Sequence, residues 1–281
     1  MNVLVTGASG QLGKEISFLL ENSKNNLFAY DRDALDITDI ESVEKAFKQH
    51  HPDVVYHCAA YTAVDAAEDE GVEQNKLVNV LGTRNISEMC QKYNSTLVFI
   101  STDYVFDGKE RDNGYLETDI TNPINAYGKA KQEAEQIVQQ HCSKFYIIRT
   151  SWVFGQYGKN FVYTMMTLAE KNDKLTVVND QIGRPTWTKS LAEFMIFLTE
   201  EHVSYGIYHF ANEGTCTWYE FAKEILKNQP VKIEPVTSDI FKQKAMRPTY
   251  SVLSLEKTNA TGFQNISWQE ALEKFKEEIY Y

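Results

Sequence analysis

The sequence predicts an α/β protein built on a doubly wound parallel sheet, with a second, smaller α/β unit. A glycine-rich turn joins the first predicted strand to the first predicted helix, and short apolar strands alternate with amphipathic helices up to residue 149. Such alternation is typical of parallel sheets with right-handed crossovers. After residue 149 the alternation loosens. We therefore expect a dinucleotide-binding domain over 1–150, rejoined by parts of 160–205, and a smaller discontinuous substrate-binding domain within 151–281.

The first strand is expected at residues 2–6, a β-branched run that leads directly into TGASGQLG at 6–13. Glycines in such a turn let the backbone approach a pyrophosphate, and the N-terminus of the next helix offers N–H groups to it. A Rossmann-type dinucleotide site is therefore predicted here. Its candidate cofactor-binding residues are Gly7, Gly10, Gln11, Leu12 and Gly13.

The second strand, expected at 27–30, ends at Asp31 and Arg32. An acid at this place usually binds the adenosine ribose hydroxyls, whereas an arginine accommodates a 2′-phosphate, so NADH and NADPH both remain open. A solvated loop is the alternative. Asp36 and Ile37 complete this part of the predicted cofactor site, before a helix expected over 40–50 with Asp39 as its N-cap.

A third strand, expected at 53–57, runs into a stretch of small residues. Ligands of open parallel sheets bind at the carboxyl ends of the strands, and small residues there let a cofactor lie against the backbone. The predicted cofactor contacts in this stretch are Ala59, Ala60, Tyr61 and Thr62. One helix is expected over 71–92, then an apolar strand over 96–100 that leads to Thr102 at the same sheet edge.

The stretch NAYGKAKQEAE at 125–135 predicts a helix that carries Tyr127 and Lys131 four residues apart, and therefore on one face. The lysine charge is expected to lower the pKa of the tyrosine toward neutrality, which suits donation of a proton to a carbonyl oxygen. Thr102 would hydrogen-bond the same oxygen. These groups together predict carbonyl reduction with a nicotinamide cofactor. Taken singly, they also fit a solvated helix face and a capping threonine.

The rest of the chain is expected to form the remaining sheet and the smaller unit. A strand at 145–149 leads to a loop with Trp152, and a helix at 160–171 and a strand at 175–179 are expected to complete the sheet. Arg184 is the single arginine of the loop at 181–186. Further expected elements are a helix at 188–201, a strand at 206–211, and helices near 217–228 and 267–279.

Bulk composition excludes several other classes of protein. A net charge of −11 argues against general nucleic-acid binding. No apolar stretch reaches the length of about 18 residues that a membrane span needs, and no cationic leader precedes an apolar run, so we expect a cytoplasmic protein. The four cysteines and six histidines show no metal-ligand spacing, and no metal site is predicted from them.

These motifs resemble the extended short-chain dehydrogenase/reductase superfamily and, more narrowly, the dTDP-4-dehydrorhamnose reductase family. TGASGQLG and YGKAK at 127–131 are common to the superfamily. More specific are CAAYTAVDAAE at 58–68, STDYVFDG at 101–108 and RTSWVFG at 149–155, supported by LDITD at 35–39 and DQIGRPT at 180–186. The resemblance covers nearly the whole chain.

The resemblance implies reduction of dTDP-4-dehydro-L-rhamnose (dTDP-6-deoxy-L-lyxo-4-hexulose) to dTDP-L-rhamnose by NADPH or NADH. It implies Thr102, Tyr127 and Lys131 as the catalytic set. It also implies substrate contacts at Val64, Thr102, Asp103, Tyr104, Trp152 and Arg184. Arg184 would pair with the diphosphate, since a planar guanidinium suits phosphate, and a surface ion pair is the alternative. Asp103 is followed by tyrosine, where related dehydratases have glutamate, and this favours plain reduction.

Some members of this family dimerise through Mg²⁺, and Glu15 matches one position of that site, so the resemblance also implies a homodimer. The alternative for Glu15 is a solvated glutamate on the first helix. Two other functions stay open: a 4-ketoreductase or epimerase for another nucleotide sugar, and a non-catalytic NAD(P)-binding regulatory subunit.

Overall fold

A computed structural model describes residues 1–21 and 23–280. Its centre is a parallel sheet of six strands in the order β10-β5-β4-β3-β1-β2, which confirms the predicted fold class. The strands are β1 (Asn2–Thr6), β2 (Asn26–Tyr30), β3 (Val54–His57), β4 (Thr96–Thr102), β5 (Phe145–Thr150) and β10 (Gly206–His209).

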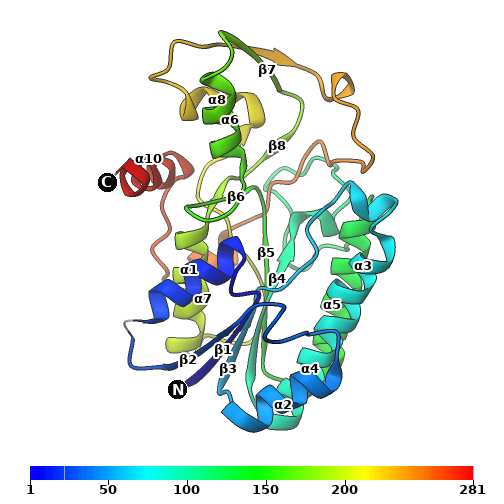
Figure 1. Cartoon of the computed structure of the whole chain (residues 1–281). Coiled ribbons are helices and arrows are strands. Elements are labelled where there is room, and N and C mark those ends of the chain that lie inside the picture. Colours follow the sequence, from blue (N-terminus) through cyan, green and yellow to red (C-terminus); the bar gives the residue numbers. More distant parts are fainter. Residues whose placement is uncertain (22, 281) are drawn as a thin grey trace.

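Helices cover both faces of this sheet (Figure 1). The helices α1 (Gln11–Glu21) and α7 (Thr188–Glu200) lie on one face, and α2 (Ile40–His50), α4 (Thr83–Tyr93) and α5 (Ala126–His141) lie on the other. The sheet residues therefore divide between two buried clusters, with Val5 and Ile148 in one and Val55, Phe99 and Ile147 in the other. Strands buried on both faces need a nearly continuous apolar sequence, which is what β3 and β4 have.

The strand order changes direction beside β1. The chain adds β2 on one side of β1, then crosses to the other side to add β3. The loops that follow β1 and β3 consequently diverge at the carboxyl edge of the sheet, and this switch point is where open α/β sheets bind their ligands. The glycine turn and the small residues at 58–62 both lie there.

A smaller unit lies beyond this edge, at the top of Figure 1. Its own buried cluster includes Phe154, Phe221 and Phe275, and its two-stranded parallel sheet pairs β7 (Lys174–Val178) with β12 (Lys232–Val236). Its helices are α6 (Phe161–Ala169), α8 (Trp218–Ile225) and α10 (Trp268–Tyr280), and its short strands are β6 (Val153–Phe154), β8 (Ile182–Gly183), β9 (Thr186–Trp187) and β11 (Cys216–Thr217). The short helix α9 (Glu256–Asn259) contacts β10.

The expectation that the strand at 175–179 completes the central sheet is wrong. This segment is β7, which pairs only with β12, while β10 takes the sixth place in the central sheet. The physical reason is the burial pattern of β7, in which Leu175 and Val177 are buried and Lys174 and Thr176 are exposed. Such alternation fits a sheet with one covered face and not a sheet covered on both.

The single helix expected over 71–92 is also interrupted. It consists of α3 (Val72–Lys76), a π-helical turn over Leu77–Gly82, and α4. Within the turn, the Asn79 side chain bonds both the N–H (3.0 Å) and the C=O (2.9 Å) of Tyr61. A Cβ on Gly82 would lie 2.6 Å from Ile37. The wider turn thus lets this helix approach the strand ends closely, as π-turns often do near functional sites.

Across residues 1–21 and 23–280, none of the helices combines the length and the apolar character needed to cross a membrane.

Candidate active site

The glycine turn after β1 forms a cradle in which only backbone fits. Gly7 has a φ of +67°, and a Cβ there would lie 2.6 Å from the backbone nitrogen of Ala59. A Cβ on Gly13 would lie 2.2 Å from the carbonyl oxygen of Gly7. Gln11 and Leu12 begin α1 directly beneath this turn. The N-terminus of α1 therefore lies against a turn of closely packed backbone, and a helix N-terminus after such a turn suits the binding of a pyrophosphate.

The end of β2 lies next to this cradle, because the Ala8 N–H donates to the carbonyl of Tyr30 at 2.9 Å. Asp31 Oδ1 accepts from the N–H groups of Asp33 and Ala34, both at 3.1 Å, which fixes the carboxylate at the start of a turn. Arg32 is exposed beside it. Asp31 and Arg32 therefore both lie where a bound NADH would have its ribose 2′-hydroxyl and a bound NADPH its 2′-phosphate.

Asp36 and Ile37, two predicted cofactor contacts in the loop after β2, have mainly structural roles. Asp36 accepts hydrogen bonds from the hydroxyl (2.7 Å) and the N–H (2.9 Å) of Thr38, which lower the pKa of Asp36. Ile37 is buried in the core against Gly82. Both residues lie near the sheet edge, but the Asp36 side chain is hydrogen-bonded within its turn and the Ile37 side chain is packed in the core.

The segment after β3 links the glycine cradle to the helix that carries the tyrosine and lysine. Cys58 and Ala59 lie against Gly7, and Tyr61 is held by Asn79. Ala60 is half-buried and Thr62 is exposed. Beneath this segment, Thr6 Oγ1 lies 2.7 Å from Nδ1 of the buried His57. The predicted cofactor contacts in 59–62 therefore line one continuous edge between the switch point and α5.

The helix α5 places Tyr127 at its first turn, directly opposite the end of β4. Asn125 is the N-cap and accepts from the Gly128 N–H at 2.7 Å. Gly128 allows the contact, because a Cβ there would lie 2.1 Å from the carbonyl oxygen of Tyr104. The Thr102 hydroxyl interacts with the Tyr127 phenol and tends to lower its pKa. The predicted threonine and tyrosine are therefore brought together.

The expected low pKa of Tyr127 is wrong for this structure. Burial raises its pKa, and the neighbouring Asp103 and Tyr104 add to the rise. Lys131 is not among the groups that shift it. The reason is geometric: four residues of helix put both side chains on one face, but the Lys131 ammonium lies 4.0 Å from the Phe99 ring centroid, on β4. The phenol is consequently protonated at neutral pH.

Lys131 is 2% exposed, which is rare for a lysine. Burial lowers its pKa to about 7, although the charges of Glu135 and Cys58 act in the opposite direction. Burial, together with the charge of Lys131, lowers the pKa of His57 to about 3. Since His57 ends β3 and Cys58 follows it, Lys131 lies beside the end of this strand. The three predicted catalytic residues therefore converge on the ends of β3 and β4.

Asp103 and Tyr104 form a short 3₁₀ turn directly after β4. Asp103 is 3% exposed and accepts from the Thr102 hydroxyl at 3.0 Å, and its burial raises its pKa to about 6. The Tyr104 ring meets the Tyr127 ring edge-on at 6.1 Å. Burial and the charge of Asp103 raise the pKa of Tyr104 to about 12. Both residues thus lie directly beside Thr102.

The remaining predicted substrate residues come from the smaller unit and from the segment after β3. Trp152 has a left-handed φ of 48°, which is uncommon for a residue other than glycine, and its ring packs against Gly183. Arg184 donates to the carbonyl of Gly214 at 3.1 Å, and its Nε is buried without a partner. Within residues 1–21 and 23–280 it forms no ion pair, unlike the alternative considered for it. Val64 is half-buried.

Two further side chains, Arg247 and Trp218, contact the predicted substrate residues, and no sequence motif indicates this. Arg247 lies 5.7 Å from the Tyr104 ring and pairs with Asp65 at 3.0 Å. Trp218 stacks on Trp152 at 3.6 Å. Each contact joins segments that are far apart along the chain, so neither belongs to a local motif. They extend the site toward the smaller unit.

Glu15 is not a solvated glutamate, so that alternative is wrong. It is 4% exposed and accepts from the Thr188 hydroxyl at 2.8 Å, and burial raises its pKa. No group of three or more potential metal ligands was found in the described part of the chain. The carboxylate of Glu15 is thus used inside the protomer, where it joins α1 to α7, and a metal role at a dimer interface stays a prediction.

A dinucleotide cradle at the switch point and a Thr–Tyr–Lys set on the neighbouring strand ends define an NAD(P)H-dependent oxidoreductase of the extended short-chain dehydrogenase/reductase type. The family described as the RmlD substrate binding domain matches residues 1–281. The chain belongs to this family, that of the dTDP-4-dehydrorhamnose reductases.

Relatives of known name agree with this placement. A dTDP-4-dehydrorhamnose reductase from Aggregatibacter actinomycetemcomitans is 41% identical, over 98% of this chain and 98% of the relative. A dTDP-4-keto-6-deoxy-D-glucose reductase from Streptomyces niveus is 38% identical, over 96% of this chain and 94% of the relative. A crystal structure of the dTDP-4-dehydrorhamnose reductase from Bacillus anthracis in complex with NADP has a TM-score of 0.95 and 41% identity, covering 99% of each chain.

Proposed function

We propose that this protein reduces the C4 ketone of dTDP-4-dehydro-L-rhamnose to give dTDP-L-rhamnose, with NADPH as the hydride donor. The observation that carries the proposal is the convergence of Thr102, Tyr127 and Lys131 beside the glycine cradle. Membership of the reductase family, and the NADP bound to the Bacillus anthracis relative, support the choice of substrate class and cofactor.

The cofactor residues fit a dinucleotide because the cradle admits no side chain at Gly7 or Gly13. The pyrophosphate would lie at the N-terminus of α1, the adenosine ribose near Asp31 and Arg32, and the nicotinamide end near Ala59 and Lys131. When bound, the reduced nicotinamide supplies hydride to the ketone carbon. Arg32 would favour the 2′-phosphate of NADPH.

The proton is assigned to Tyr127. Its raised pKa keeps the phenol protonated at neutral pH, so it can donate to the C4 oxygen as negative charge develops there. Thr102 would donate a second hydrogen bond to that oxygen, and the Lys131 cation would stabilise the phenolate that forms. In this role the lysine acts after proton transfer, and does not need to lower the pKa of Tyr127 beforehand.

The substrate would span the two units. Val64, Asp103, Tyr104 and Trp152 would border the sugar, and Arg184 would hold the diphosphate. The buried, unpartnered Nε of Arg184 supports this role, because a buried donor without a partner is costly unless a ligand satisfies it. We further propose the division into a dinucleotide-binding domain over 1–150, with parts of 160–205, and a smaller substrate-binding domain.

The test is anaerobic mixing of the purified protein with NADPH and the dTDP-4-keto sugar, followed by absorbance at 340 nm and by identification of the sugar product. Consumption of one NADPH for each dTDP-L-rhamnose formed is expected. Binding of NADPH without its oxidation would overturn the proposal and favour a regulatory NAD(P)-binding subunit.

A second candidate is reduction of a different dTDP-4-keto-6-deoxy sugar, because the name of the Streptomyces niveus relative specifies dTDP-4-keto-6-deoxy-D-glucose. The same assay with both dTDP sugars, and with UDP- and GDP-linked 4-keto sugars, would separate these activities. A cytoplasmic location and a homodimer, with or without Mg²⁺, complete the proposal. Light scattering with and without a chelator would test the dimer.

A further inference from the structure

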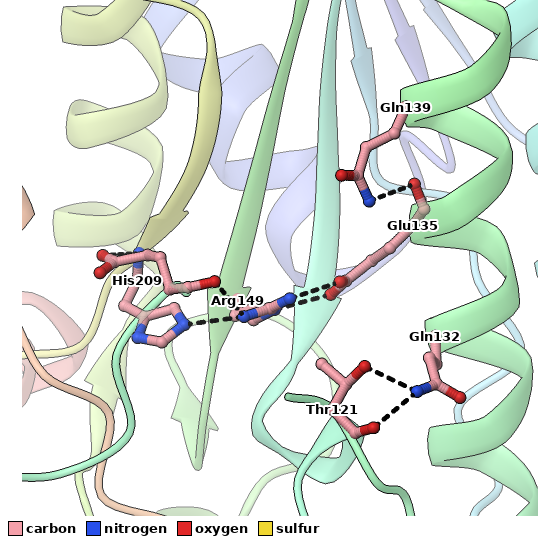
Figure 2. A network of polar contacts seen from close by, with 7 residues as sticks. Thr121, Gln132, Glu135, Gln139, Arg149 and His209 are labelled. Carbon is pink, nitrogen blue, oxygen red and sulfur yellow. Dashed lines mark hydrogen bonds and ion pairs between the residues drawn. The ribbon is translucent and has the colours of Figure 1, made fainter. Parts of the chain in front are cut away.

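A buried ion pair lies on the inner face of α5, one helical turn beyond Lys131. Arg149, on β5, donates from Nε to Glu135 Oε1 at 2.9 Å and from Nη2 to Glu135 Oε2 at 2.7 Å. Figure 2 shows the two parallel bonds between strand and helix. Both side chains are only 3% exposed. This is the bidentate geometry that a guanidinium forms with a carboxylate, and it occupies both carboxylate oxygens.

Arg149 is itself fixed from the other side. Its Nη1 lies 3.3 Å from the Glu117 carbonyl oxygen and 3.3 Å from His209 Nε2 (Figure 2), and its guanidinium lies 5.0 Å from the Phe106 ring. These contacts come from the loop before α5, from β10 and from the segment after β4. The guanidinium therefore has little freedom to follow Glu135 if the helix shifts.

Lys131 and Glu135 are four residues apart on α5, a spacing at which a lysine and a glutamate normally pair. Here no such pair forms, and the lysine ammonium lies over Phe99. The other groups whose charges couple to that of Lys131 are Cys58 and His57, at the end of β3. Glu135 still acts on Lys131 through space, and its charge raises the pKa of the lysine.

We infer that Arg149 is a positioning residue for Lys131: by holding both oxygens of Glu135, it keeps this carboxylate from drawing the lysine ammonium along the helix, away from the strand ends. The effect on turnover rests on the proposed function. The effect on Lys131 itself does not, because it concerns the protein without substrate.

The first experiment measures the pKa of Lys131 by NMR of the full-length protein, with the signal assigned through Lys131→Met. In Arg149→Met the freed carboxylate should pair with the lysine and raise its pKa by about one unit. In Glu135→Gln the carboxylate charge is lost, and the pKa should fall by about one unit. Shifts of opposite sign are the expected signature. Loss of the Glu135 charge lowers the pKa of Lys131 whether or not Arg149 positions the lysine, so Arg149→Met is the deciding variant. Arg149 is not among the groups that shift the pKa of Lys131, and an unchanged or lowered pKa in Arg149→Met would overturn the inference.

Arg149→Lys serves if Arg149→Met does not fold, because a lysine holds one carboxylate oxygen only and should also raise the pKa of Lys131. The matched control is Arg84→Met. Arg84 lies 3.4 Å from His141 at the far end of α5, so this variant disturbs the same helix without releasing Glu135. It should leave the pKa of Lys131 unchanged.

The second experiment measures kcat at pH 6, where Lys131 is largely charged in the wild type and about half charged once Glu135→Gln lowers its pKa. Arg149→Met should lower kcat by about tenfold or more, because a small displacement of a catalytic group is costly. Adding Glu135→Gln should restore kcat to within about threefold, since the competing charge is removed. No recovery in a double variant that folds would overturn the inference. If the wild type oxidises no NADPH while the NMR shifts are as expected, only the proposed function fails.

Discussion

The two halves of the site are built in different ways. On the cofactor side, Gly7, Gly13 and Ala59 form a cradle from backbone atoms of neighbouring loops. On the proposed substrate side, Arg184, Trp152 and Tyr104 depend on partners from distant segments, among them Gly214, Trp218 and Arg247. Substitutions that add a side chain to the backbone cradle are excluded by contact with other backbone atoms, whereas single substitutions can alter the shape of a pocket lined by side chains. This fold can therefore change its sugar specificity while it keeps its dinucleotide site.

The largest effect is expected where the two halves meet. Tyr127→Phe removes the proposed proton donor and should lower kcat by about 10³-fold, while the dissociation constant for NADPH stays within about threefold. Stopped-flow absorbance at 340 nm and fluorescence titration measure these two quantities. Tyr163→Phe is the control, because this tyrosine bonds the Gln156 carbonyl at 3.0 Å, away from Thr102. A kcat within tenfold of wild type would remove Tyr127 from the mechanism.

On the cofactor side, Gly13→Ala should raise the dissociation constant for NADPH by about 100-fold, because its Cβ would overlap the Gly7 carbonyl and move the turn. Gly10→Ala, whose Cβ would lie 3.1 Å from the same oxygen, should cause a smaller loss. Isothermal titration measures both, and urea unfolding checks the fold. Equal losses in the two variants would contradict the geometry of the cradle.

The buried lysine makes stability depend on pH. The pKa of Lys131 is about 7 in the folded chain, against an ordinary value of 10.5 for lysine, so the unfolded chain binds more protons between these limits. Stability should therefore rise with pH in this window. Relative to Lys131→Met, the wild type should gain about 3.5 kcal/mol in the free energy of unfolding between pH 7 and pH 10.

Urea unfolding at a series of pH values measures this difference. Lys129→Met is the control, since Lys129 is exposed on the same helix and should follow the wild type. If the wild type and Lys131→Met show parallel pH profiles, the lysine is not desolvated as the structure implies.

The smallest effect is expected on the substrate side. Arg184→Ala should raise KM for the nucleotide sugar by about tenfold and lower kcat much less, because a diphosphate contact is made in both the ground state and the transition state. Steady-state kinetics of Arg184→Ala and Arg84→Ala give the comparison. An unchanged KM in the first variant would place the diphosphate elsewhere.

The cofactor half could largely be predicted from the sequence, and the substrate half only in part. Gly7, Gly13 and Tyr127 occur in short motifs whose local geometry follows from neighbouring residues, and the structure places them at the expected edge. The pKa of Tyr127 could not be predicted, because burial and Asp103, both results of tertiary packing, outweigh the helical spacing to Lys131. The contact of Arg247 with Tyr104 likewise requires the folded chain.

The prediction that the strand at 175–179 belongs to the central sheet was wrong for a related reason. Strand propensity identified a strand there, but its partner, β12, is formed by residues 232–236, and β10 of the central sheet lies between them in the sequence. During synthesis on the ribosome, the central sheet has its last strand when residue 209 has emerged, while β7 is still without a partner. The nascent chain can therefore complete its central sheet first, and β7 keeps an unpaired edge until residues 232–236 follow.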